Sequence, residues 1–455
     1  MMKKDIRYVA MSVALAAIAL AGCTHFEEDD LFDENSSLRI EHFNKDLQSR
    51  LVEQSSDGNY GWVIQYFVSG TDEMDFEGFN LLGRFYDNGK VTLASNHHYL
   101  RNGNSDKYTE HSSTYEMLKE EGPVLAFNTW NDILTVFVDP VDPSSAPATI
   151  ISDGEGMGGD QNLVFHAFDD DCILFHGQRH SAKVRFVPCD RPWETYLSDV
   201  EATRNHITNN TITSYYVVSG TDTLYFKNLR SGVITYCERV NDPLFPSTIN
   251  CIFTPKGFYL QHRNNIGGTT FQEFKLSDDD TCLMSENDSV QVYATWDNYI
   301  ISHSSVWEMD AELFTEQQQS LFNQISNEIT SLNSKWKLKS LGIGRSTGKN
   351  PVNGLVLTYY TKWPNTDAKN TNTAGLELTL TKPQTKQMRV DCTEGSAIDN
   401  NLSVFTTRGT AIEALMREFA STLKGTYNMT PNDYFLPTSV HCTSVDGGME
   451  FTIGN

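Results

Sequence analysis

The spacing of apolar residues divides the chain into an N-terminal helix, two long β-rich stretches and a mixed C-terminal segment. Ile40, Phe43 and Leu47 recur every three or four positions. This spacing predicts a helix over 36–53. After the helix the apolar period becomes two, which predicts short strands between turn residues. We expect these strands at 62–68, 79–86, 91–94, 113–119, 123–128, 133–138, 162–168, 171–178 and 182–188.

A linking helix and a second run of strands follow. The helix is expected at 192–208, with Pro192 in its first turn. The string Val-Ser-Gly-Thr-Asp occurs in both β-rich stretches, at 68–72 and 218–222, which hints at a duplicated module. Strands of the second run are expected at 211–218, 222–228, 232–239, 249–253, 257–263, 269–275 and 289–294.

The last segment combines helices with strands. A long helix is predicted over 311–335, with Asp310 as its N-cap and Leu321 on its apolar side. A second helix is predicted to start with a capping box of Thr410 and Glu413. The fold class we expect is mainly β, α+β overall, with antiparallel β-barrel or sandwich-like modules and a few linking helices. The expected division is 36–200, 201–305 and 306–455.

The first 22 residues have the pattern of a secretory signal. Basic residues come first, a short Ala-rich apolar stretch follows, and Leu20-Ala21-Gly22 precedes Cys23. This arrangement resembles the lipobox of bacterial lipoproteins. It implies cleavage of the signal peptide 1–22 and covalent attachment of diacylglycerol to Cys23, with an acidic tether over 23–35. No other cofactor is expected.

Acidic residues outnumber basic ones, 59 to 35, for a net charge of −24. Nucleic acid is therefore excluded as an expected partner, because phosphate binding needs a basic surface. Loss of residues 1–22 would change the net charge to −26, since three bases and one acid are removed. The run Glu27-Glu28-Asp29-Asp30 beside the anchor resembles a surface-export signal of Bacteroidota lipoproteins. A solvated tether is the alternative interpretation.

Seven cysteines remain after Cys23, an odd number for an exported protein, so at least one is free or intermolecular. If 172–178 and 182–189 form a hairpin that turns at His180 and Ser181, Cys172 lies opposite Cys189. Residues opposed in this way approach disulfide distance, which predicts a bond between these two cysteines.

The motifs in the sequence do not support catalysis. A Gly-x-Gly-x-x-Gly match at 154–159 runs into a strand instead of a helix, and 342–350 lacks residues that a phosphate-binding loop requires. We therefore expect a protein that is not an enzyme, with a metal-dependent or carboxylate-based hydrolase as the alternative.

Two sets of side chains are candidates for ligand binding. With a three-residue turn at 169–171, His166 and His176 fall on one sheet face, where they could bind a metal ion, and Phe165, Ile173 and Phe175 form the opposite apolar face. Aromatic rings near strand ends could stack on sugar or peptide; these are Trp130, Trp296, Trp307 and Trp363.

The order of landmarks along the chain resembles an uncharacterised Bacteroidota lipoprotein family, domain of unknown function 4302. The resemblance is strongest over 31–200 and rests on residues at 31–40, 61–66, 85–91, 122–131, 158–160 and 193–197. Members of such families are often encoded beside SusC/SusD-type nutrient-uptake systems. The resemblance implies a location and a neighbourhood, and it transfers no catalytic or ligand-binding residue.

The main functional hypothesis is a lipoprotein of the outer membrane, exposed on the cell surface, that binds glycan or peptide as an accessory to an uptake system. Its expected partners are the membrane, through the lipid on Cys23, and outer-membrane uptake proteins. A location on the periplasmic face and a role as a structural or adhesive subunit are the alternatives.

Overall fold

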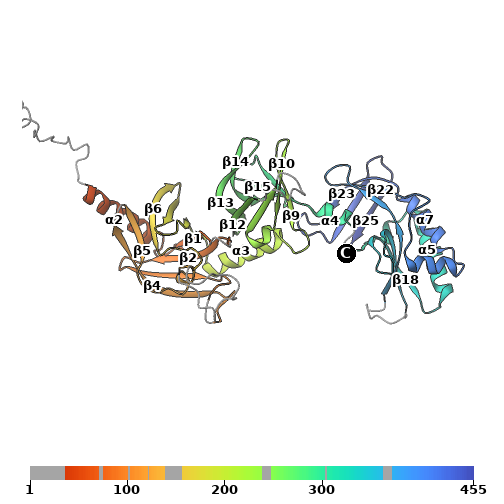
Figure 1. The fold of residues 1–455 in the computed structure, drawn as a ribbon, viewed down its shortest axis with the longest axis horizontal. Coiled ribbons are helices and arrows are strands. Elements are labelled where there is room, and N and C mark those ends of the chain that lie inside the picture. The colour runs from red at the N-terminus through yellow and green to blue at the C-terminus, as the bar shows by residue number, and fades with distance from the viewer. Residues whose placement is uncertain are drawn as a thin grey trace, which may run out of the picture.

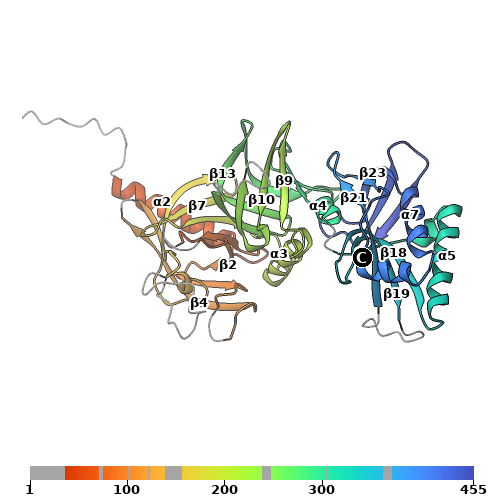
Figure 2. The same cartoon turned by 45° about the vertical axis from the view of Figure 1, so that its right-hand side comes forward.

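The protein consists of three β-rich bodies that follow one another in chain order, as Figures 1 and 2 show from two directions. Two are closed eight-stranded barrels and the third is a nine-stranded sheet, so the expected mainly-β fold with antiparallel barrels is confirmed. This computed structural model describes residues 36–70, 75–100, 103–120, 122–138, 156–237, 247–302, 305–361 and 371–455.

The first barrel is an up-and-down meander in which every strand pairs with its neighbour in sequence and β8 closes on β1. Inward side chains such as Trp62, Ile64 and Tyr66 build its core. Helix α2 (Ser36–Glu53) buries Leu47 and Leu51 against the same core. The strands are β1 (Trp62–Phe67), β2 (Phe79–Phe85), β3 (Lys90–Ser95), β4 (Thr109–Lys119), β5 (Pro123–Phe127), β6 (Asn162–Asp169), β7 (Cys172–Gly177) and β8 (Lys183–Pro188).

The second barrel repeats this connectivity, with β16 closing on β9. Helix α3 (Trp193–Ile207) links the two barrels. The repeated pentapeptide begins directly after the first strand of the first barrel, at Val68, and at the end of the first strand of the second barrel, at Val218. The strands are β9 (Ser214–Ser219), β10 (Asp222–Lys227), β11 (Val233–Cys237), β12 (Ser247–Thr254), β13 (Gly257–Ile266), β14 (Thr269–Leu276), β15 (Leu283–Ser285) and β16 (Gln291–Ala294). A 3-10 turn, η2 (Leu229–Ser231), precedes β11.

Direct contacts hold the two barrels together. The amide of Gly78 donates to the carbonyl of Cys251 at 2.9 Å, and the side chain of Asn80 donates to the carbonyl of Phe253 at 2.9 Å. Glu77 pairs with Arg204 of α3 at 3.1 Å. Burial raises the pKa of the Glu77 carboxyl, and the nearby guanidinium opposes this shift. The junction is therefore a packed interface with its own ion pair.

The third body is an antiparallel sheet of order β20-β19-β18-β17-β25-β24-β23-β22-β21, and α5 and α7 lie together at the side away from the second barrel (Figure 1). The strands are β17 (Trp307–Met309), β18 (Lys337–Arg345), β19 (Asn353–Tyr360), β20 (Thr371–Glu377), β21 (Thr379–Thr381), β22 (Gln387–Asp391), β23 (Gly425–Pro431), β24 (Ser439–Ser444) and β25 (Glu450–Gly454). The helices are α4 (Trp296–Ile301), which leads in from the second barrel, then α5 (Glu316–Leu332), α6 (Asn400–Thr407) and α7 (Ile412–Thr422).

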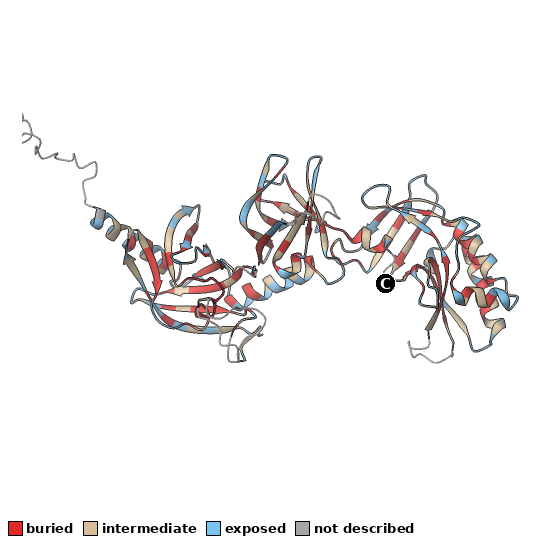
Figure 3. Ribbon diagram, viewed as in Figure 1, coloured by how far each residue is buried: buried red, intermediate tan, exposed pale blue. Residues whose placement is uncertain are grey.

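Buried residues are concentrated on the strands. Figure 3 shows buried positions running along the strands of all three bodies, with exposed positions at hairpin tips and on the outer sides of helices. No helix among the described residues is both long enough and apolar enough to cross a membrane.

Three local predictions are wrong. The strand expected at 133–138 is instead a 3-10 turn, η1 (Thr135–Phe137), whose three residues are buried. The helix expected over 311–335 is divided: Asp310 caps a 3-10 turn, η3 (Ala311–Leu313), and α5 starts after Thr315. The expected capping box of Thr410 and Glu413 does not form, because the Glu413 carboxylate contacts Arg417 and Thr406 instead.

Candidate functional site

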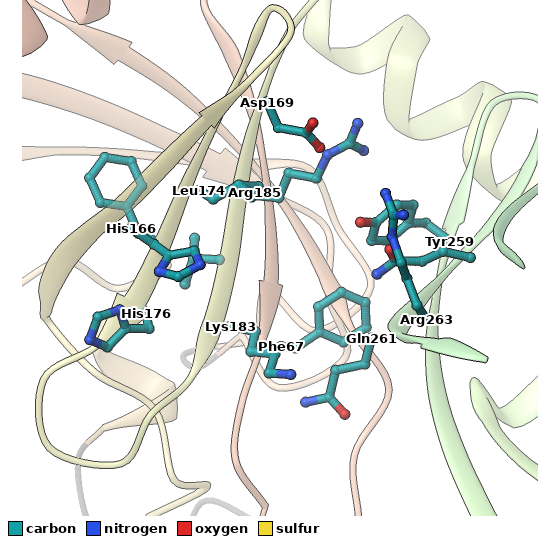
Figure 4. Close-up of a pocket in the computed structure, with 13 residues that line it drawn as sticks. Phe67, His166, Asp169, Leu174, His176, Lys183, Arg185, Tyr259, Gln261 and Arg263 are labelled. Atoms are coloured by element: carbon teal, nitrogen blue, oxygen red, sulfur yellow. The ribbon is translucent and has the colours of Figure 1, made fainter. Parts of the chain in front are cut away.

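A cavity of about 520 Å³ lies at the junction of the two barrels (Figure 4). Ligand-binding cavities in proteins commonly have this size and often lie between domains. Its walls come from β1 and β6–β8 of the first barrel and from β13–β14 of the second. The lining residues are Phe67, His166, Asp169, Leu174, Phe175, His176, Lys183, Val184, Arg185, Tyr259, Gln261, Arg263 and Gln272.

Strand alternation decides which side chains reach this cavity. On β8, Val184 and Phe186 point into the first barrel and are buried in its core. Lys183 and Arg185 alternate with them along the strand and therefore point outward. On β13 of the second barrel, Phe258 and Leu260 are core residues, and Tyr259 and Gln261 lie on the outer face. The cavity is thus bounded by the outer faces of two barrels.

Arg185 and Tyr259 meet across the junction. The guanidinium carbon lies 4.7 Å from the centre of the Tyr259 ring, within the range of a cation–π contact. One terminal nitrogen of Arg185 donates to the side-chain oxygen of Gln65 at 3.1 Å. Its Nε is buried and has no hydrogen-bond partner in the described part of the chain. The guanidinium is held in place by these contacts and still has unused hydrogen-bond donors.

Lys183 and His262 form a second contact between the barrels. The Lys183 Nζ lies 2.6 Å from the His262 Nδ1. Burial lowers the pKa of His262, and the lysine charge lowers it further; burial also lowers the pKa of Lys183. A neutral imidazole accepts a hydrogen bond from an ammonium at Nδ1, so this pair needs no acidic partner.

His166 and His176 come together as the sequence predicts. Their ring centres are 6.1 Å apart, and both imidazoles line the cavity. Asp169 pairs with Cys172, so the turn has two residues rather than three, and the β6–β7 register shifts between Phe165 and Ala167. His166 is the extra residue of this bulge, which brings its ring to the His176 side. Ile173 and Phe175 point into the barrel core, as predicted.

A metal centre would need more than this pair. Across the described ranges, no group of three or more His, Cys, Asp or Glu side chains has a geometry that could hold a metal ion.

The four tryptophans proposed as ligand platforms do not form one surface. Trp296 and Trp307 are 2% and 1% exposed and belong to the core of the second and third bodies, so the prediction that they contact ligand is wrong. Trp130 is 50% exposed, and its indole donates to Asp132 at 2.5 Å. It lies outside the cavity lining. Trp363 lies outside the described residues, as does Cys23.

The predicted disulfide does not form. The β7–β8 register pairs Ile173 with Phe186 and His176 with Lys183, which carries Cys172 opposite Val187 instead of Cys189. Both thiols are free and buried. The hairpin therefore differs by two residues from the register that the bond requires.

The sequence reasoning missed the cationic and amide side chains of the cavity. Tyr259, Gln261 and Arg263 alternate along one strand, and Lys183 and Arg185 alternate along another. These strand faces carry long polar side chains and no carboxylate, which is unusual in so acidic a chain. That pattern could have indicated the binding site from the sequence.

A family profile matches residues 28–278, more than half of the 455-residue chain. The chain belongs to the domain of unknown function family DUF4302. The resemblance to this domain family of unknown function, seen in the sequence, is thereby confirmed. The DUF4302 match includes every residue that lines the cavity, and it stops after β14 of the second barrel.

Other comparisons add little. No curated protein matches the chain. The crystal structure of the DNA polymerase III subunit beta from Pseudomonas aeruginosa is 8% identical and covers 91% of this chain and 97% of its own, with a TM-score of 0.12. The Helicobacter pylori beta clamp bound to DNA ligase peptide is 10% identical, with coverage of 91% and 97% and a TM-score of 0.12. At this TM-score the likeness supports no conclusion about fold or function.

Proposed function

We propose that this DUF4302 chain is a surface lipoprotein of the outer membrane that captures oligosaccharides for an uptake system. The lipobox at Cys23 and the acidic segment after it support the anchor and the location. The inter-barrel cavity carries the binding hypothesis, because it is the place where side chains suited to a sugar converge from two rigid scaffolds.

The chemistry of the lining favours sugar. Tyr259 offers a ring, and Gln261 and Gln272 offer amides that both donate and accept hydrogen bonds. Hydroxyl groups of a sugar need both kinds of partner, and the apolar faces of its ring pack on aromatic side chains. Phe67 and Leu174 supply the apolar part of the wall.

A binding screen tests the proposal. The chain without residues 1–22 is presented to a glycan array and to a peptide library, and hits are measured by calorimetry. We expect oligosaccharides among the hits, and Tyr259→Ala should weaken their binding about five- to thirtyfold, since loss of one ring contact removes about 1–2 kcal/mol. Tyr86→Ala, at an exposed tyrosine outside the cavity lining, is the matched control and should bind as the unaltered chain does.

Two results would count against oligosaccharide capture: hits confined to peptides, or sugar binding that Tyr259→Ala leaves unchanged. The lipid anchor is tested separately by mass spectrometry of the chain isolated from membranes. Cys23→Ser should remove the lipid mass and release the protein from the membrane fraction. Retention of both would exclude the proposed anchor.

A further inference from the structure

The cavity concentrates positive charge in an acidic protein. Lys183, Arg185 and Arg263 line it, against one carboxylate, Asp169, among the described lining residues. The chain as a whole carries a net charge of −24. A cationic cavity in such a chain attracts anions locally although the whole molecule repels them.

These three cations differ from many others in the protein because they lack acidic partners. Arg191, Lys382 and Arg417 each have a carboxylate oxygen at 2.5–2.9 Å. Within the described part of the chain, none of the three cavity cations has a carboxylate at ion-pair distance. Lys183 instead contacts His262, and Arg185 contacts Gln65 and the ring of Tyr259. Their charge is left available to a ligand.

Arg185 is the best-prepared of the three. Gln65 and Tyr259 fix the plane of its guanidinium from two sides, and its Nε is buried without a partner. A planar guanidinium donates two parallel hydrogen bonds to a carboxylate or to two oxygens of a sulfate.

The cavity is too large and too apolar for a small inorganic anion alone. Its volume of about 520 Å³ suits a group of several rings. A second cavity of about 290 Å³, also between the barrels, shares Arg185 as a lining residue. Its remaining lining mixes acids and bases, including Asp190, Glu273 and Lys256. Arg185 thus lines both the cationic cavity and the mixed one.

We infer that the cavity selects an acidic oligosaccharide, whose carboxylate or sulfate group contacts Arg185, with Lys183 and Arg263 beside it. This inference rests on the proposed function and adds the chemical class of the ligand. The sugar rings contact Tyr259 and the two glutamines, and the anionic group gives the specificity.

Calorimetry with matched ligands tests the inference. The probes are an oligogalacturonate, the same oligomer with its carboxylates methyl-esterified, a sulfated oligosaccharide, an oligoglutamate peptide and sodium sulfate. We expect an acidic oligosaccharide to bind at least tenfold more tightly than the ester, and its affinity to fall as salt rises. Arg185→Gln and Arg263→Gln should each lower this affinity about tenfold, the loss expected for one charge-assisted contact. Arg408→Gln, at an exposed arginine of the third body, is the control.

Each other outcome separates the inference from the proposed function. Equal binding of acid and ester overturns the anionic class and leaves oligosaccharide capture standing. Binding of oligoglutamate without any sugar supports the anion site and overturns oligosaccharide capture. Sulfate that binds as tightly as the oligomers overturns selection of a sugar, and binding of no probe overturns both. Because Arg185 also joins the barrels, the thermal unfolding of the Arg185→Gln variant is recorded. If that variant does not fold, the Arg263→Gln variant, at an exposed arginine, tests the inference.

Discussion

Asp160 illustrates how a buried charge can serve structure alone. This carboxylate is 3% exposed, and its oxygens accept backbone amide protons from Arg179, His180 and Ala182. A side chain at Gly177 would place its Cβ 1.8 Å from an Asp160 oxygen, so only glycine fits there. The bonds fix the β7–β8 hairpin, whose two ends present His176 and Lys183 to the cavity. Asp160 therefore positions the candidate site without facing it.

His97 is a buried base that should make stability depend on pH. It packs against Phe79 and Phe137, and one ring nitrogen contacts the carbonyl of Ile133 at 3.2 Å. Burial lowers the pKa of His97 from 6.5 to about 4. The unfolded chain therefore binds a proton in this range that the folded chain does not, and stability falls as pH drops from 6.5 to 4.

We expect this histidine to remove about 3 kcal/mol of stability between those pH values. Hydrogen exchange of amides in β2 and β3 measures the loss. His97→Phe, which keeps the aromatic packing, should remove this part of the pH dependence, at a cost of about 1 kcal/mol at neutral pH for the unpaired Ile133 carbonyl. The control is His42→Gln, at an exposed histidine, which should leave this pH dependence unchanged. An unchanged slope in His97→Phe would show that other groups control the acid response.

At the scale of elements, the sequence was most informative where local pattern and burial agree. The predicted helix over 36–53 and the linking helix at 192–208 both form, because their apolar spacing matches the surfaces they cover. The segment at 133–138 looks like a strand since it is apolar and rich in β-branched residues. It forms a buried 3-10 turn instead, with Asn131 accepting the amide of Ile133. Periodicity alone cannot distinguish these two buried outcomes.

The sequence prediction placed the start of α5 too early because two N-cap residues lie close together in the sequence. Asp310 caps only a short turn, while Thr315 and Gln318 form a reciprocal capping box that starts the helix. Thr315→Ala should destabilise the first turn of α5 by about 1 kcal/mol and speed exchange of its amides roughly fivefold. Gln317→Ala, at an exposed neighbour without a capping role, should leave exchange unchanged. Equal effects of both substitutions would contradict the capping role of Thr315.

At the scale of the whole molecule, the candidate site exists only because two barrels meet. Lys183 and Arg185 come from the first barrel, and Tyr259 and Arg263 come from the second. The sequence shows that each pair alternates on a strand, and it predicted the two histidines that meet at the bulge. It could not show which outer face of one barrel packs on which face of the other. That choice depends on interface contacts such as Gly78 with Cys251 and Glu77 with Arg204.

A buried ion pair joins the second barrel to the C-terminal sheet. Asp297 of α4, 2% exposed at its side chain, lies 2.7 Å from the Lys382 ammonium and accepts the backbone amide of Lys386 at 2.9 Å. The same ammonium donates to the Tyr216 hydroxyl of β9 at 2.6 Å. The Lys382 ammonium therefore connects α4 and its own segment of the C-terminal body to β9 of the second barrel.

Lys382→Met should loosen this junction, because it leaves the Asp297 carboxylate buried without its cation. Removal of one partner from a buried pair costs about 3–5 kcal/mol, whereas an exposed pair contributes about 1 kcal/mol or less. We therefore expect much faster hydrogen exchange in α4 and at the amide of Lys386 in the Lys382→Met variant. The control is Lys339→Met, which should change exchange little because its partner Glu308 is partly exposed. The double variant Asp297→Asn with Lys382→Met should recover part of the protection, since it removes the unpaired charge. A double variant that exchanges faster than Lys382→Met would mean that packing, and not charge pairing, holds the two bodies in register.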